Sequence, residues 1–120
     1  MSVPSGRGVD GFIADLGGQR VEATLTGNIV VYHLTPASGA LVGRSVPTGV
    51  EVGELQGWPA IPPHWIHLPE EIHFASTNVD RQDVLEGWQR HSRDIGVWDM
   101  ARRPVLNWIA HVRGVIGQAA

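Results

Sequence analysis

The run Arg90-His91-Ser92-Arg93 is the part of the sequence best suited to chemistry. An imidazole can accept the proton of a nearby hydroxyl, so His91 would help Ser92 to attack an acyl group. The two arginines would stabilise the negative charge that develops during such an attack. These residue types therefore predict a hydroxyl that accepts an acyl group and holds it as an oxyester.

The same run also has a structural interpretation, which we favour. Side chains that are adjacent on an extended chain point in different directions, so His91 need not reach Ser92. In this interpretation Trp88 packs beneath a sheet, while Arg90 and Arg93 cap carbonyl groups or form ion pairs. The nearby acids available for such pairs are Asp83, Glu86 and Asp94.

The chain contains no cysteine, which excludes disulfides, thiolate zinc sites and any thioester formed by this chain alone. The chain also contains six histidines, a residue type that can ligate a metal without cysteine. His64, His67 and His73 lie close in sequence, but on an extended segment His64 and His67 would point to opposite faces. His111 lies near the C-terminus and is expected on the surface of a helix. We therefore predict no metal site and no cofactor.

The composition is that of one ordinary globular domain. The chain has 120 residues, of which 42% are hydrophobic and 18% are charged, and its formal net charge is -3. This balance offers no basic field for nucleic acid. No apolar run approaches the roughly 20 residues of a membrane span, and the N-terminus lacks the apolar core of a signal peptide. We expect a cytoplasmic protein with a loose tail at residues 1–8 and one domain at 9–120.

Hydrophobic periodicity predicts a short helix followed by an antiparallel meander. Apolar residues at helical spacing predict one or two helical turns over residues 9–16. Alternating residues predict a strand over 21–26, and Gly-Asn then joins it to a second strand over 29–34. Further turn signals precede two more segments, 40–46 and 50–55. The meander therefore has three or four strands.

The second half of the chain differs from the first in its composition and in its apolar periodicity. Residues 57–69 are rich in proline and tryptophan, which suits an extended segment but not a central strand. Residues 70–97 show little apolar periodicity and are expected to form a long ordered loop. Helical spacing from about residue 103 to 116 predicts an amphipathic helix, with Pro104 in its first turn and Gly117 at its end. The fold class is α+β, with helices on one face of an antiparallel sheet.

Two motifs resemble those of known proteins. Trp58-Pro59-Ala60-Ile61-Pro62-Pro63, straight after the predicted meander, resembles the motif that leads into the active-site loop of ubiquitin-conjugating enzymes. Gly87-Trp88-Gln89-Arg90-His91-Ser92-Arg93 is similar to a stretch of a bacterial branch, the prokaryotic conjugating-enzyme-like family E. The segment His73 to Asn78 matches the His-Pro-Asn segment of the family loosely, and Trp98 lies where the family places a tryptophan.

The resemblance implies a ubiquitin-conjugating-enzyme-like fold, here with a short N-terminal helix and one C-terminal amphipathic helix. It also implies a bacterial ubiquitin-like modification system, with a ubiquitin-like protein and a ThiF-type activating enzyme as partners. Without the catalytic cysteine of the family, the favoured role is that of a binding or scaffold protein. The residues expected to bind a partner are Trp58, Pro59, Pro62, Pro63, Trp65, Trp88, Arg90 and Arg93.

Other interpretations stay open at this point. The chain could be a transferase that uses Ser92 or His91 as the acyl acceptor, or an unrelated small α+β binding module. A natural cysteine could also have been replaced, for example at Ala75 or Ser76. Finally, all nine basic residues are arginine. This bias is typical of a GC-rich genome, or it spares the protein from amine-directed conjugation by leaving no lysine as an acceptor.

Overall fold

The computed structural model describes residues 7–74, 79–80, 84–98 and 103–120. Within these ranges the chain forms two α-helices, six strands and one short 3-10 helix. In chain order they are α1 (Gly8–Gly18), β1 (Ala23–Thr26), β2 (Ile29–Leu34), β3 (Val46–Glu51), η1 (Val52–Leu55), β4 (Trp65–Pro69), β5 (Val79–Asp80), β6 (Trp88–Ser92) and α2 (Pro104–Ile116). The α+β class predicted from the sequence is confirmed.

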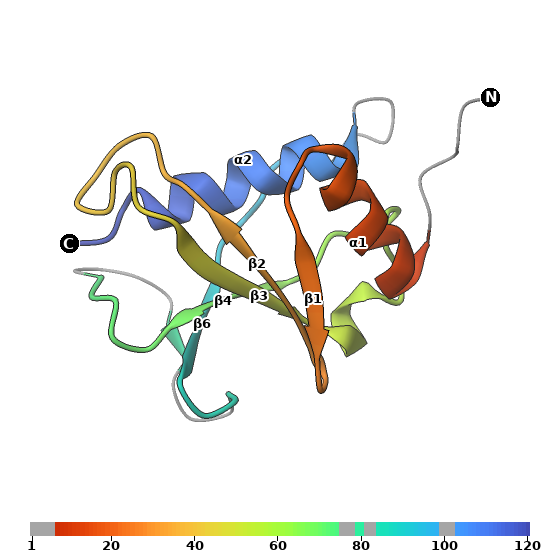
Figure 1. The fold of residues 1–120 in the computed structure, drawn as a ribbon, viewed down its shortest axis with the longest axis horizontal. Coiled ribbons are helices and arrows are strands. Elements are labelled where there is room, and N and C mark those ends of the chain that lie inside the picture. Colours follow the sequence, from red (N-terminus) through yellow and green to blue (C-terminus); the bar gives the residue numbers. More distant parts are fainter. Residues whose placement is uncertain (1–6, 75–78, 81–83, 99–102) are drawn as a thin grey trace.

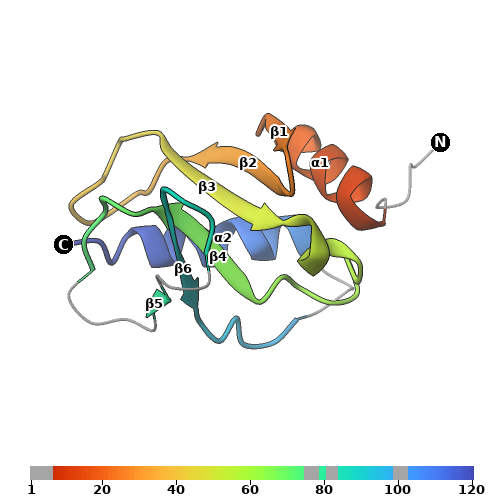
Figure 2. The same ribbon diagram turned by 90° about the horizontal axis from the view of Figure 1, so that it is seen from below.

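The described strands form one antiparallel sheet in the order β1-β2-β3-β4-β6-β5. The helices α1 and α2 contact each other and pack with the sheet around one core (Figure 1). Figure 2 shows β4 and β6 in front of α2, with no described helix on the near side of these strands. One face of the sheet is therefore covered by helix, and the other is left to its own side chains. No helix in the described ranges is long and apolar enough to cross a membrane.

Both predicted helices are present. Phe12 and Leu16, one turn apart on α1, are fully buried, and α1 ends at Gly18. Pro104 is the first residue of α2, where its missing N–H donor costs nothing. The apolar face of α2 packs on the sheet through Val105, Trp108, Ile109, Val112, Val115 and Ile116.

A buried hydrogen bond joins α2 to β2 inside the core. The Nε1–H of Trp108 donates a hydrogen bond to the Tyr32 hydroxyl at 2.8 Å. Both side chains are buried, and burial raises the pKa of Tyr32, because the phenolate would lose its hydration. Phe12 packs edge-on against both Tyr32 and Trp58. One aromatic cluster therefore joins α1, β2 and α2.

The predicted strand over residues 40–46 is wrong. Residues 38–43 form bends and turns, and β3 begins at Val46. The sequence signals for a turn around Pro47 and Gly49 fall inside β3, which is paired with β2 along its whole length. Pairing within the sheet overrides the local preference here. Only the start of the predicted 50–55 strand is extended, because Val52–Leu55 form the 3-10 helix η1.

The prediction for residues 57–97 is also wrong in part. β4 is a central strand, with prolines only beside its start and at its last residue, and β5 and β6 lie inside the predicted loop. The proline-rich motif therefore lies between η1 and β4 and does not follow the whole meander. β6 shows no apolar alternation because its core-facing residues are Gln89 and His91, which are fully buried. The six described strands exceed the three or four predicted.

Substitution of Gly39 tests how closely the loop after β2 packs on the end of α2. Gly39 has φ +86°, and a Cβ added there would overlap the backbone carbonyl of Gly117. Gly43 has a similar φ of +77° but open space around it. We expect Gly43→Ala to cost about 1 kcal/mol through backbone strain alone. Gly39→Ala should cost more than about 3 kcal/mol, because the loop must also move.

Urea denaturation of both variants gives the two free energies of unfolding. Equal losses of stability in Gly39→Ala and Gly43→Ala would contradict the close contact between this loop and α2.

Candidate functional site

The pairing of β4 with β6 separates the residues that the sequence placed together. Ile66 is paired with His91, and Trp65 with Ser92. Because successive side chains of a strand point to opposite faces, His91 faces the core while Ser92 faces away from it. His91 is fully buried, and its ring centroid lies 4.4 Å from that of Phe74. His91 therefore does not serve as a base for Ser92.

Ser92 instead meets a histidine from the segment before β4. The Ser92 Oγ lies 3.2 Å from the Nε2 of His64. Sequence reasoning missed this pair because His64 is 28 residues away and becomes a neighbour only through the register of the sheet. No local signal in the sequence fixes that register.

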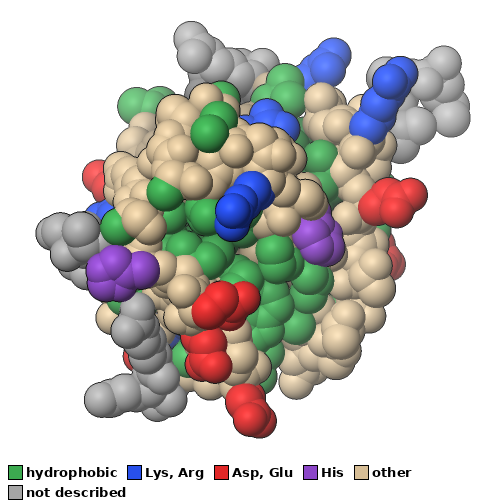
Figure 3. All heavy atoms as spheres, turned by 60° about the vertical axis from the view of Figure 1, so that its left-hand side comes forward, with side chains coloured by type: hydrophobic (Ala, Val, Ile, Leu, Met, Phe, Trp, Pro, Cys, Tyr) green, Lys and Arg blue, Asp and Glu red, His purple; other side chains and the backbone are tan. Residues whose placement is uncertain are grey.

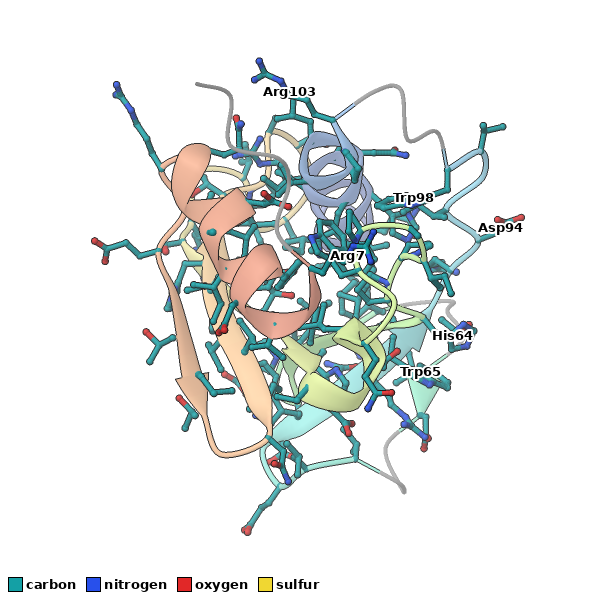
Figure 4. All side chains as sticks on the ribbon, turned by 90° about the vertical axis from the view of Figure 1, so that its right-hand side faces the viewer. Arg7, His64, Trp65, Asp94, Trp98 and Arg103 are labelled. Atoms are coloured by element: carbon teal, nitrogen blue, oxygen red, sulfur yellow. The ribbon has the colours of Figure 1, made fainter. Side chains whose placement is uncertain are left out.

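His64 is held in place by a carboxylate from η1. The Oε1 of Glu54 accepts hydrogen bonds from the backbone N–H groups of His64, at 2.9 Å, and Trp65, at 2.8 Å. Burial raises the pKa of Glu54, and these two hydrogen bonds oppose that shift because they stabilise the ionised form. The His64 ring also packs edge-on against Trp65, with centroids 4.8 Å apart. Figure 4 shows the two side chains next to each other at one side of the molecule.

Residues of β6 and β5 in turn hold the Trp65 side chain in place. The guanidinium of Arg90 lies over the Trp65 ring, 4.2 Å from its centroid. Arg90 donates to the Oδ2 of Asp80 from Nε at 2.9 Å and from Nη2 at 2.6 Å. The acid that pairs with Arg90 is thus Asp80, which was not among those predicted. Of the predicted acids, Asp83 lies outside the described residues.

An open groove begins beside the Ser92–His64 pair. Its volume is about 520 Å³, and it runs between residues 61–64 on one side and 92–95 on the other. Ile61 is 63% exposed, and Pro62 and Pro63 also line this wall. Across from them, Arg93 donates from Nη2 to the Oε1 of Gln118 at 2.9 Å. We call this feature the Pro62–Ser92 groove.

The predicted binding residues divide between the core and the surface. Trp58 is only 1% exposed, and its Nε1–H donates to the Oδ2 of Asp15 at 3.0 Å. Pro59 is buried, and its carbonyl accepts a hydrogen bond from Trp98. The first half of the proline motif is therefore placed inside the fold, while Pro62 and Pro63 line the groove. Trp65, Trp88, Arg90 and Arg93 are partly exposed.

The histidines do not gather around a common point. His64 contacts Ser92, whereas the Nε2 of His67 lies 3.0 Å from the Oε1 of Glu51. Among the residues that the structure describes, no group of three potential metal ligands is close enough to hold an ion. His111, expected on a helix surface, is half-buried on α2.

His67 gives the sheet face a pH-dependent stability. Burial lowers the pKa of His67 and of His111, although the charges of Glu51 and Asp94, respectively, act in the other direction. These two histidines thus bind protons less readily in the folded chain than in the unfolded chain, and their contribution to stability should fall as the pH drops below about 6.5. We expect His67→Gln to reduce this loss, because the glutamine carries no titrating group.

The measurement is the melting temperature between pH 8 and pH 5. His33→Gln is the matched control for the removal of one imidazole, since His33 is exposed on β2. An identical slope in His67→Gln and the parent chain would contradict the assignment.

The chain has no match among known proteins: no protein-family model, no curated protein and no solved structure matches it. The Pro62–Ser92 groove and the side chains around it are therefore the basis for a functional proposal.

Proposed function

We propose that this chain is a ubiquitin-conjugating-enzyme-like protein without a catalytic cysteine, and that it binds the ubiquitin-like protein of a bacterial modification system. In this role it acts as a scaffold that holds the C-terminal tail of that protein in the Pro62–Ser92 groove. The ThiF-type activating enzyme of the same system is a second partner. We place the protein in the cytoplasm with that system.

The order of the elements supports this proposal. A helix precedes the antiparallel meander, the motif Trp58 to Pro63 leads into β4, and a single helix packs across the sheet. This order agrees in part with what the resemblance to ubiquitin-conjugating enzymes implies. Three features depart from that expectation: the chain has no cysteine, the motif leads into the central strand β4 instead of a loop, and β5 and β6 extend the sheet beyond the expected meander.

The observation that carries the binding role is the apolar wall of the groove. Ile61 is 63% exposed, and Pro62, Pro63 and Ile95 line the same cavity. Exposed apolar side chains that line a concave surface are typical of binding sites, because a partner removes them from water. An open groove of about 520 Å³ suits an extended segment of chain better than a folded surface.

The charge of Arg93 supports a chain terminus as the occupant. Arg93 and Asp94 both line the groove, and the exposed Asp94 accepts a hydrogen bond from the backbone of Gly96. Figure 4 shows the Asp94 side chain pointing outward. A guanidinium is well suited to hold a terminal carboxylate through paired hydrogen bonds.

The face drawn in Figure 3 carries side chains of both charges. Figure 3 shows, among the described side chains of that face, acidic groups gathered beside a band of hydrophobic ones, with arginines set apart from each other. This arrangement offers no broad basic field to nucleic acid on that face.

Isothermal titration with a ubiquitin-like protein of a bacterial modification system tests the binding role. We expect Ile61→Asp to weaken binding about tenfold or more, because a buried isoleucine contributes about 1.5–3 kcal/mol. Leu25→Asp is the matched control, since Leu25 is 50% exposed on the edge strand β1, away from the groove. It should leave the affinity unchanged.

Arg93→Gln tests the contact with the terminal carboxylate. Its loss of affinity should match that caused by amidating the C-terminus of the ubiquitin-like protein, and the two changes together should cost no more than either alone. Arg44→Gln, at an exposed arginine in another loop, is the control. Absence of binding, or additive losses, would contradict the proposal, as would binding of the activating enzyme alone.

A further inference from the structure

We propose that Ser92 is an acyl acceptor with His64 as its general base. The substrate class is an activated acyl group, such as the thioester of a peptide carboxyl terminus. This activity goes beyond the binding role above, although it uses the same groove.

The geometry of the pair supports a proton transfer. The Ser92 Oγ and the His64 Nε2 lie 3.2 Å apart, within reach of a hydrogen bond. Ser92 is the last residue of β6 and is paired with Trp65, the first residue of β4. Ser92 is therefore part of a regular strand, and such rigid elements keep the geometry of a site better than loops do. His64 lies in the bend one residue before β4, next to the strand residue that is paired with Ser92.

The surroundings restrict the movement of the imidazole. The Glu54 carboxylate fixes the backbone of His64 through its N–H group. The ring of Trp65 packs against the imidazole, and Arg90 covers Trp65 in turn. Asp80 holds Arg90 through two hydrogen bonds. This chain of contacts keeps the base aligned with Ser92.

The groove provides both space and charge for the acyl group. Its volume of about 520 Å³ accommodates a few residues of peptide, and Ile61 and Ile95 give its walls apolar surface. Arg93 follows Ser92 directly and lines the same groove. The Arg93 Nε is buried and has no hydrogen-bond partner among the described residues, and only Nη2 is bound, to Gln118. A positive charge at this position would stabilise the oxyanion that forms during acyl transfer.

The reaction is a balanced acyl exchange. The Ser92 Oγ attacks the carbonyl carbon of the thioester, and its proton passes to the Nε2 of His64. The carbon–sulfur bond then breaks, and the leaving thiolate takes that proton from the imidazolium. The products are an oxyester at Ser92 and a free thiol. A serine hydroxyl is a weak nucleophile, so we expect this exchange with activated donors and not with ordinary amides.

The composition makes the product easy to identify. The chain contains neither cysteine nor lysine. Its one unmodified aliphatic amine is therefore the α-amino group of the N-terminus, where acylation would form an amide. Neutral hydroxylamine cleaves an ester and leaves an amide intact, so one treatment separates the two products.

The experiment is to incubate the full chain with the mercaptoethanesulfonate thioester of acetyl-glycyl-glycine and to follow its intact mass. We expect one added acyl group that hydroxylamine removes, located on the peptide that contains Ser92. Ser92→Ala should lose this adduct, and Ser92→Thr, which keeps a hydroxyl, should retain part of it. His64→Gln should slow its formation about a hundredfold, as expected for loss of a general base.

Ser45→Ala and His33→Gln are matched controls at exposed positions outside the groove, and both should react like the parent chain. Equal labelling of Ser92→Ala, an adduct that resists hydroxylamine, or no adduct on the folded parent chain would overturn the proposal. Binding of the ubiquitin-like protein without thioester labelling would overturn this site alone. Labelling without such binding would overturn only the scaffold role.

Discussion

β4 and β6 run antiparallel, with Trp65 opposite Ser92 at one end and Pro69 opposite Trp88 at the other. This register decides which side chains face the helices and which face solvent. Gln89 secures it from inside the fold, because its Nε2 donates to the backbone carbonyls of Pro69 at 2.8 Å and Ile72 at 2.7 Å. A slip of one residue would expose Gln89 and His91 and bury Arg90 and Ser92. The groove and the Ser92–His64 pair both depend on this one pairing.

The elements that follow a simple pattern could be predicted from the sequence. The helix α2 shows the full apolar spacing of a packed helix, and the β1–β2 hairpin has its glycine, with φ +61°, in the turn. The strands β4 and β6 could not be recognised in the same way. Prolines flank β4, and β6 buries a glutamine and a histidine. The side-chain amide of Gln89 finds its backbone partners only in the folded chain, so composition alone is typical of a loop in both segments.

The sequence could predict only some of the contacts around Ser92. One interpretation made His91 the base for Ser92, whereas the interpretation that we favoured left His91 out of reach of Ser92. Alternation along a strand separates them, and the opposite strand supplies His64 instead. The proline motif was treated as one surface, yet Trp58 fills the core beside Phe12 while Pro62 and Pro63 remain at the groove. Burial of this kind depends on how α1 meets the motif, which no local pattern encodes.

The contacts of Trp65 have a practical consequence. Its indole lies against an imidazole on one side and carries a guanidinium over its face. Indole emission responds to charge and to polar groups at such short range. Trp58 and Trp108 are shielded within the core, whereas Trp88 and Trp98 are partly exposed like Trp65. A ligand that displaces His64 would change the contribution of Trp65 to the fluorescence, so the emission of this one indole would report occupation of the groove without an attached dye.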